Sequence, residues 1–287
     1  MKYNLYIIWI LRSFASKLRI MGKVISFMNN KGGVGKTTSA FTIGLAWAKM
    51  GKKVLFIDLD SQSNLTSMIS VTNPLEQVWE RTIEDAFIAG PQDGLPIMHT
   101  EDPLVDFVPA DLDLSNFDTD TSNTKLKEYL LLDLLEGIRD SYDFIILDCP
   151  PALGSIIANA MVASDYLVLV AQPNGLSYKG VQMVVGLYNQ IIADKRLNPT
   201  LQILGVIISR YQKDKISDYF LEQFRHDYGQ LILKPCIRKA TKVEQATSFN
   251  RSIFDEGLMS KATEEYMKVS QELLMRISSD EMHGREE

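Results

Sequence analysis

The segment KGGVGKTT, residues 31–38, limits what this chain can fold into more than any other stretch. It follows an apolar run at residues 24–28 and precedes a helical pattern that begins near Lys36. A glycine-rich turn between a strand and a helix lets backbone N–H groups converge on phosphate oxygens at the start of the helix. Lys36 would then reach the β- and γ-phosphates, and the Thr37 hydroxyl would bind Mg²⁺. The order of these elements predicts a nucleotide site, against the alternative of a glycine run without function.

The loop departs from the strict phosphate-binding pattern at one position. The pattern G-x-x-x-x-G-K-[ST] requires glycine at position 30, where this chain has Asn30. A second lysine, Lys31, follows at the mouth of the loop. The strict pattern does not include this additional cation.

Composition is that of an ordinary globular protein. The chain has 287 residues, of which 46% are hydrophobic and 23% charged, enough for one large α/β domain. The net charge of −6 argues against a protein whose whole surface coats nucleic acid, so any DNA contact must be a local patch. Cys149 and Cys236 lie far apart and form no metal-binding spacing, which favours a reducing cytoplasmic setting.

The first 20 residues differ in composition from the rest. Residues 3–11 are apolar except for Asn4, and basic residues flank them. This run is about half the roughly 20 residues that a membrane span needs, and a nucleotide site that follows it so soon argues against export. We expect residues 1–20 to be an extension outside the fold or the product of an upstream start codon, with an amphipathic docking helix as the alternative. Residues 21–287 are expected to form the folded domain.

Apolar runs and helical patterns alternate along the rest of the chain. Strands are expected at residues 24–28, 54–59, 104–109, 144–147, 166–171, 202–209 and 231–233. Helices are expected at residues 36–50, 82–88, 126–139, 155–163, 177–193, 217–228 and 261–277. Nearly continuous apolar strands separated by helices are typical of a parallel sheet buried on both faces. We therefore expect a single α/β domain with a mostly parallel, twisted sheet of about seven or eight strands and helices on both faces.

Acidic residues follow two of the expected strands. Asp58 and Asp60 lie at the end of one strand, and Asp148 lies at the end of another. Ligands in open α/β sheets bind beyond the carboxyl ends of the strands, where the phosphate loop also lies. A carboxylate opposite the Thr37 hydroxyl offers the hard oxygen ligands that Mg²⁺ prefers. We expect these acids to join the loop in one site, although the segment with Asp58 and Asp60 would by itself also suit an exposed acidic turn.

Three segments in this order, KGGVGKTT, VLFIDLDSQSNLTS and YDFIILDCPP, resemble the deviant-Walker-motif ATPases of the ParA/MinD group. Within it the chain is most similar to the ParA (Soj-like) DNA partition ATPases, from about Met21 to the C-terminal helix. The resemblance implies a single P-loop NTPase domain that uses ATP and Mg²⁺ and forms a nucleotide-sandwich homodimer. Family members often have proline and glycine where this chain has Ser61 and Ser63, a difference that should matter little for the chemistry.

The resemblance assigns roles to the loop. Lys31 is the signature lysine that reaches across the dimer to the partner's phosphates, and Lys36 is the lysine of the phosphate loop itself. A cation supplied in this way is worth on the order of 10³–10⁵ in rate for arginine fingers, so hydrolysis would depend on dimerisation. The residues expected to bind the cofactor are Gly32, Gly33, Val34, Gly35, Lys36, Thr37 and Thr38.

The resemblance also assigns roles to the acids. Asp60 would position the attacking water and is the third catalytic residue, beside the two lysines. The implied metal-site residues are Thr37, Asp58 and Asp148. Asp148 would hold the metal through water, and Asp58 would support either the metal or the loop.

A basic segment lies near the C-terminal end of the domain. Residues 234–251, KPCIRKATKVEQATSFNR, carry five basic residues against one acidic residue, Glu244. The segment resembles, imperfectly, the part of partition ATPases that binds DNA without sequence preference by neutralising phosphates, which predicts a steep salt dependence. A solvated basic face on a helix is the alternative. The residues expected to bind DNA are Arg238, Lys239, Lys242 and Arg251.

These expectations combine into an ATP-dependent partition ATPase that hydrolyses ATP slowly until a ParB-like centromere-binding partner stimulates it. We expect it in the cytoplasm, associated with the nucleoid when ATP is bound. The alternative is a MinD-like or scaffold-type nucleotide switch that positions a protein cargo. Membrane binding is not expected, because the chain ends in the acidic segment SSDEMHGREE, which has no apolar face.

Overall fold

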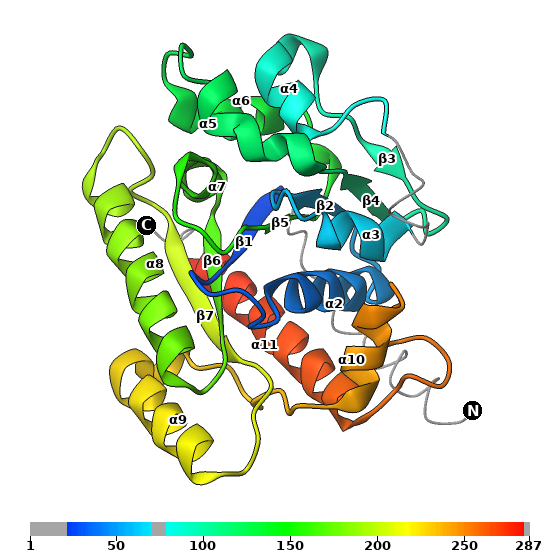
Figure 1. The fold of residues 1–287 in the computed structure, drawn as a ribbon, viewed down its shortest axis with the longest axis vertical. Coiled ribbons are helices and arrows are strands. Elements are labelled where there is room, and N and C mark those ends of the chain that lie inside the picture. The colour runs from blue at the N-terminus through cyan, green and yellow to red at the C-terminus, as the bar shows by residue number, and fades with distance from the viewer. Residues whose placement is uncertain (1–21, 71–78, 284–287) are drawn as a thin grey trace.

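The computed structural model describes residues 22–70 and 79–283, which form a seven-stranded sheet in the order β3-β4-β2-β5-β1-β6-β7. All neighbouring strands pair in parallel except β3, which is antiparallel to β4. The expected mostly parallel sheet of a P-loop domain is therefore confirmed (Figure 1). The expected extension at residues 1–20 lies outside the described residues. The strands are β1 (Lys23–Met28), β2 (Val54–Asp58), β3 (Met98–His99), β4 (Val105–Val108), β5 (Phe144–Asp148), β6 (Tyr166–Ala171) and β7 (Gln202–Ile208).

Helices cover both faces of the sheet (Figure 1). Side chains of β1 alternate between two buried clusters, with Val24 on one face and Ile25 on the other. The first face is covered by α4, α6, α7, α8 and α9, and the second by α2, α3, α10 and α11. The helices are α2 (Lys36–Lys49), α3 (Asn64–Ser70), α4 (Ile83–Ala89), α5 (Phe117–Asp120), α6 (Leu130–Glu136), α7 (Ser155–Ala163), α8 (Gly175–Ala193), α9 (Lys215–Tyr228), α10 (Thr241–Ser248) and α11 (Lys261–His283).

Trp47 fixes α2 between the sheet and α11. Its side chain is fully buried, and its indole Nε1 donates a hydrogen bond to the carbonyl of Ser270 at 3.0 Å. Its ring lies 4.3 Å from that of Phe144, centroid to centroid. A buried aromatic ring that contacts both partners contributes strongly to the core, so α2, and with it the loop that precedes it, has a fixed position over the sheet.

Two of the expected elements differ from the structure. The helix expected at 126–139 is regular only over α6, and 3-10 turns flank it. The strand expected at 231–233 is wrong: this segment begins as a 3-10 turn and pairs with β7 only through an isolated bridge from Val206 to Ile232. The side chain of Leu233 packs directly on Gly205, where a Cβ atom would lie only 2.8 Å from it. The segment therefore contributes a buried side chain to the core rather than a strand.

None of the described helices is both long and apolar enough to cross a membrane. The two cysteines, Cys149 and Cys236, are free, and the first is buried.

Candidate functional site

The phosphate loop joins the end of β1 to the start of α2, as the sequence predicts. Gly33 has φ 74° and Gly35 has φ 87°, left-handed conformations that glycine adopts without strain. Gly35 caps the helix, and no acidic side chain occupies its first turn. The free N–H groups of that turn therefore face the loop with the positive end of the helix dipole, which suits a phosphate anion.

Side chains from the ends of β6 and β7 hold the loop from behind. Gln172 donates from Nε2 to the carbonyl of Gly33 at 2.9 Å, and Ser209 donates from Oγ to the carbonyl of Val34 at 2.6 Å. These bonds satisfy the carbonyls of Gly33 and Val34. The loop therefore offers a ligand its N–H donors rather than these carbonyl acceptors. Our reading of the sequence missed both residues, and the only signal for them is their position just beyond two parallel strands.

Helix α8 supports the entrance of the loop. Asn29 donates from Nδ2 to the carbonyl of Val170 at 2.7 Å and to the hydroxyl of Ser177 at 3.0 Å. A Cβ atom at Gly180 would lie 2.2 Å from Asn29 Oδ1 and 3.2 Å from the backbone of Asn30. Glycine is therefore required at position 180 for α8 to approach the loop this closely.

The two lysines of the loop differ in burial. Lys36 is 6% exposed, and its ammonium group lies 3.4 Å from the carbonyl of Lys31. Burial lowers the pKa of Lys36, while the nearby carboxylates of Asp148 and Asp60 raise it. Lys31 is exposed at the mouth of the loop. The Lys36 ammonium thus lies inside the site, whereas Lys31 lies at the surface, where it could reach a second molecule.

Asp148 is buried, and neither of its carboxylate oxygens has a hydrogen-bond partner among the residues that the structure describes. Burial, and after it the Asp58 carboxylate, raises the pKa of Asp148 well above its ordinary value, while the Thr37 hydroxyl and the Lys36 ammonium lower it. Because burial outweighs these two groups, the Asp148 carboxylate is only partly compensated, and a further cation would stabilise it. Two unpaired carboxylate oxygens near a threonine hydroxyl are a hard donor set that fits Mg²⁺.

Asp58 lies opposite Asp148 in the register of β2 and β5, but its oxygens already have partners. One oxygen accepts from the backbone N–H of Asp60 at 3.1 Å, and the other accepts from the backbone and hydroxyl of Thr66 at 2.9 and 2.8 Å. Burial raises the pKa of Asp58 to about 6. Asp58 thus supports the turn that carries Asp60, a contact that differs from the two roles expected for it, toward the metal or the phosphate loop.

Asp60 itself is half-buried in that turn and accepts from the backbone N–H of Gln62 at 3.0 Å. Its charge reaches Lys36, since it contributes to the pKa of that ammonium group. The three acids that the sequence predicts for the site therefore lie at one edge of the sheet, around the phosphate loop.

Comparison with known proteins decides the family. A family model described as an AAA domain matches residues 22–203. The chromosome partitioning protein ParA of Caulobacter vibrioides is 30% identical over 257 residues, covering 88% of this chain and 94% of that protein. The chain belongs to the ParA/Soj family of partitioning ATPases.

Two further known proteins are similar to this ParA-family ATPase, one in sequence and one in fold. The sporulation initiation inhibitor protein Soj of Bacillus subtilis is 30% identical over 256 residues, covering 88% of this chain and 98% of that protein. The structure of cobyrinic acid a,c-diamide synthase from Mycobacterium smegmatis, with bound ATP analog and magnesium, has a TM-score of 0.75. It is 24% identical and covers 90% of this chain and 96% of that one, a likeness that extends to the fold.

A cavity of about 230 Å³ opens beside the phosphate loop of this ParA-family protein, between the end of β7 and α10. Gly35 and Thr38 line its loop side, and Lys239 lines the opposite side. Arg210 crosses it, with its guanidinium 2.9 Å from Glu244 on α10 and 3.5 Å from the carbonyl of Gly33. The cavity adjoins the phosphate loop and is lined by both polar and apolar side chains.

The four basic residues expected to bind DNA lie around α10 but do not form one free patch. Arg238 pairs with Glu265 at 2.5 Å, and Arg251 pairs with Asp255 at 3.0 Å. Lys242 donates from Nζ to the carbonyl of Gly257 at 2.8 Å. Arg238 lines the cavity beside the loop, as Lys239 does, whereas Arg251 lines a separate groove near α3. About half of each arginine side chain is exposed, so both can still contact a ligand.

Proposed function

We propose that ATP binding makes this protein a dimer that holds DNA without sequence preference, and that hydrolysis releases the DNA. The buried, unpaired carboxylate of Asp148 beside the phosphate loop carries this proposal, because it needs a cation and the loop needs an anion. ATP with Mg²⁺ supplies both.

The nucleotide has a place along the loop. The N–H groups of residues 32–38 and the ammonium of Lys36 bind the phosphates, and the cavity lined by Gly35 and Thr38 receives the base and sugar. Thr37 and Asp148 hold Mg²⁺, which neutralises charge on the transferred phosphate. Asp58 fixes the turn from which Asp60 orients the attacking water.

Hydrolysis depends on a second subunit. Lys31 is exposed, so it can reach the phosphates bound by a partner but leaves its own site with only one buried cation, Lys36. A cation that arrives with the partner speeds phosphoryl transfer by on the order of 10³–10⁵. A ParB-like, cargo-bound protein stimulates this step in the cytoplasm, and the protein is associated with the nucleoid while ATP is bound.

The exposed parts of Arg238, Lys239, Lys242 and Arg251 contact DNA phosphates. The two arginines are already paired with acids, so DNA must compete with Glu265 and Asp255 for them. Such phosphate contacts give a logarithmic salt slope of about −0.9 for each contact. Helix α10, which carries Lys242 and is flanked by the other three residues, adjoins the nucleotide cavity through Glu244, which provides a route by which ATP can change the position of the helix.

A gel-shift assay with an arbitrary duplex at low salt tests the proposal. The wild-type protein should shift the duplex with ATP and Mg²⁺ but not with ADP, and Arg238→Glu should lose the shift even at ATP concentrations that saturate its nucleotide site. Lys268→Glu, on the neighbouring helix α11, is the charge-matched control and should retain the shift. A duplex shift that does not depend on nucleotide, or one that Arg238→Glu leaves intact, would contradict the proposal.

A further inference from the structure

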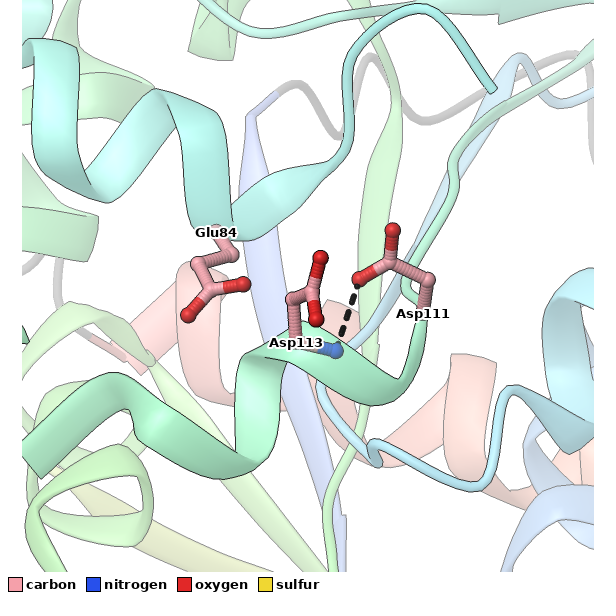
Figure 2. A group of neighbouring side chains, drawn as sticks. All are labelled: Glu84, Asp111 and Asp113. Carbon is pink, nitrogen blue, oxygen red and sulfur yellow. Dashed lines mark hydrogen bonds between the residues drawn. The ribbon is translucent and has the colours of Figure 1, made fainter. Parts of the chain in front are cut away.

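Three carboxylates converge where β4 ends and α4 begins, and the proposed nucleotide chemistry uses none of them. Glu84 lies in the first turn of α4, Asp111 precedes the 3-10 helix Leu112–Asn116, and Asp113 lies within it. One oxygen from each of the three side chains lies within 4.8 Å of the others. Figure 2 shows the three side chains gathered between the two segments.

Glu84 is the buried member of this group. It is 5% exposed, and its Oε1 has no hydrogen-bond partner in the described part of the chain. Within the same residues, none of the three carboxylates forms a salt bridge to lysine, arginine or histidine. Burial of a carboxylate disfavours its charged form, so a cation bound from outside the protein would stabilise a group arranged in this way.

Helix capping does not account for the position of Glu84. The capping function at the start of α4 belongs to Asp85, which accepts from the backbone N–H of Thr82 at 2.7 Å. Asp111 accepts from the backbone N–H of Asp113 at 3.1 Å, which fixes two of the three acids relative to each other. The local arrangement therefore brings the three acids together and leaves Oε1 of Glu84 without a hydrogen-bond partner among the described residues.

We propose that Glu84, Asp111 and Asp113 bind a divalent cation that prefers hard oxygen ligands, with Ca²⁺ as the favoured ion. Oxygens spaced within 4.8 Å can all reach one ion at the Ca–O distance of about 2.3–2.6 Å. Asp113 is exposed and Asp111 is half-buried, so water can complete the six to eight oxygen ligands that Ca²⁺ takes. Mg²⁺ requires a nearly ideal octahedron, which three side chains on two irregular segments are less suited to provide.

The ion would link α4 to the segment that leaves β4. Ala110, next to Asp111, donates its backbone N–H to the Thr66 hydroxyl at 3.0 Å, and that hydroxyl donates to Asp58. The proposed site is therefore two hydrogen bonds away from the turn that carries Asp60. It is a site separate from the one at Asp148, which lies at the end of β5.

Calorimetric titration of the nucleotide-free, EDTA-treated full chain with Ca²⁺ tests this site. We expect one saturable Ca²⁺ site in the wild type and a Ca²⁺-dependent rise in the unfolding temperature. Glu84→Gln and Asp113→Asn should each weaken binding by on the order of tenfold or more, since loss of even an outer-shell partner costs 10–100-fold. Asp113 is exposed, so its variant tests the site even if Glu84→Gln does not fold.

Two controls separate this site from others. Asp118→Asn removes a nearby exposed acid, and Asp148→Asn removes the carboxylate proposed to hold Mg²⁺ with ATP; both should retain Ca²⁺ binding. Absence of binding to the wild type at millimolar Ca²⁺ would overturn the proposal. So would equal affinity in Glu84→Gln, Asp113→Asn and the controls, and binding of Mg²⁺ without Ca²⁺ would overturn the choice of ion.

Discussion

At the scale of single residues, burial distinguishes the two lysines of the phosphate loop. Lys36 is held inside the site at the cost of desolvation, which lowers its pKa, and the acids around it offset part of that cost. Lys31 remains in solvent. This difference in burial fits the proposal that Lys36 binds the nucleotide of its own subunit and Lys31 that of another molecule.

Substitution of Lys36 tests the first of these roles. Lys36→Ala should abolish ATP binding, because the buried ammonium is the charge nearest the phosphates. In thermal unfolding, ATP with Mg²⁺ at 100 times its Kd should stabilise the wild type by about 2.7 kcal/mol and leave the variant unchanged. Lys49→Ala removes an exposed lysine from the same helix and should respond like the wild type. If Lys36→Ala still gains stability from ATP, the phosphate loop is not the ATP-binding site.

Asp148 gives a prediction with a defined pH dependence. Its pKa is raised in the folded state, so the folded protein binds more protons than the unfolded chain and loses stability as pH rises above about 4. Asp148→Asn does not titrate. In buffer without nucleotide and Mg²⁺, the variant should therefore unfold at a higher temperature than the wild type, and the difference should grow with pH.

The same variant should lose activity while it gains stability. Mg²⁺-dependent ATP turnover should fall by on the order of 10- to 100-fold, the usual effect of removing a group that holds a metal through water. An unfolding temperature that does not differ from the wild type at any pH, together with unchanged turnover, would show that Asp148 is not the uncompensated charge described above.

Residues of the site could be predicted from the sequence when they belong to a short local motif, and could not when they contact the loop from a distant segment. Lys36, Asp60 and Asp148 belong to motifs whose spacing is local, so the sequence predicted their positions at one edge of the sheet. The bonds of Asp58 to Thr66 depend on the path of the turn between them, and spacing alone left two roles open. Gln172 and Ser209 contact the loop from more than a hundred residues away, and only the folded strand order brings them there.

At the scale of elements, long apolar segments were predicted well and short polar ones were not. The expected boundaries of α7 and β6 agree with the structure, because both are buried and continuous. Our reading of the sequence missed α3 and α10 because each has eight residues or fewer, too short a segment for helical periodicity to repeat. The segment 231–233, expected to be a strand, is also short, and in the structure Leu233 packs against Gly205 while the segment forms only an isolated bridge to β7.

The contact between α8 and the loop gives a test with a matched control on one helix. Gly180→Ala should destabilise the protein by about 1–3 kcal/mol, because its Cβ has no space beside Asn29 and the Asn30 backbone. It should also weaken ATP binding, since either α8 or the loop has to move. Gly186→Ala adds a Cβ that meets nothing within 4 Å and should stabilise the helix by about 0.5–1 kcal/mol. Denaturant unfolding with and without ATP measures both effects; equal behaviour of the two variants would mean that α8 does not fix the loop.

At the scale of the whole molecule, the groups proposed to bind one nucleotide all lie at one edge of the sheet. The proposed exception is the catalytic cation, which a second subunit would supply. The phosphate loop, the base cavity and the unpaired Asp148 belong to one subunit. In the proposed dimer, Lys31 acts on the nucleotide of the other subunit. Such a shared active site would make ATP both the substrate and the link between the two subunits.

Substitution of Asp60 should trap the proposed ATP-bound dimer. Asp60→Ala should bind ATP and remain dimeric, because the residue orients water and does not contact the phosphates in this account. Sedimentation analysis should give twice the monomer mass with ATP and Mg²⁺, and the dimer should persist while wild-type protein returns to the monomer as ATP is consumed. Undiminished ATP turnover in Asp60→Ala would reject its role.

The most direct test of the shared site is to mix two inactive variants. Lys31→Gln and Asp60→Ala should each hydrolyse ATP poorly. In the mixed dimer, one site combines the intact Asp60 of one subunit with the intact Lys31 of the other. Mixing equal amounts before ATP is added should therefore restore about a quarter of wild-type turnover if subunits pair at random in a two-fold dimer. A mixture no more active than either variant alone would contradict the account, because it would place Lys31 and Asp60 in the same subunit's site.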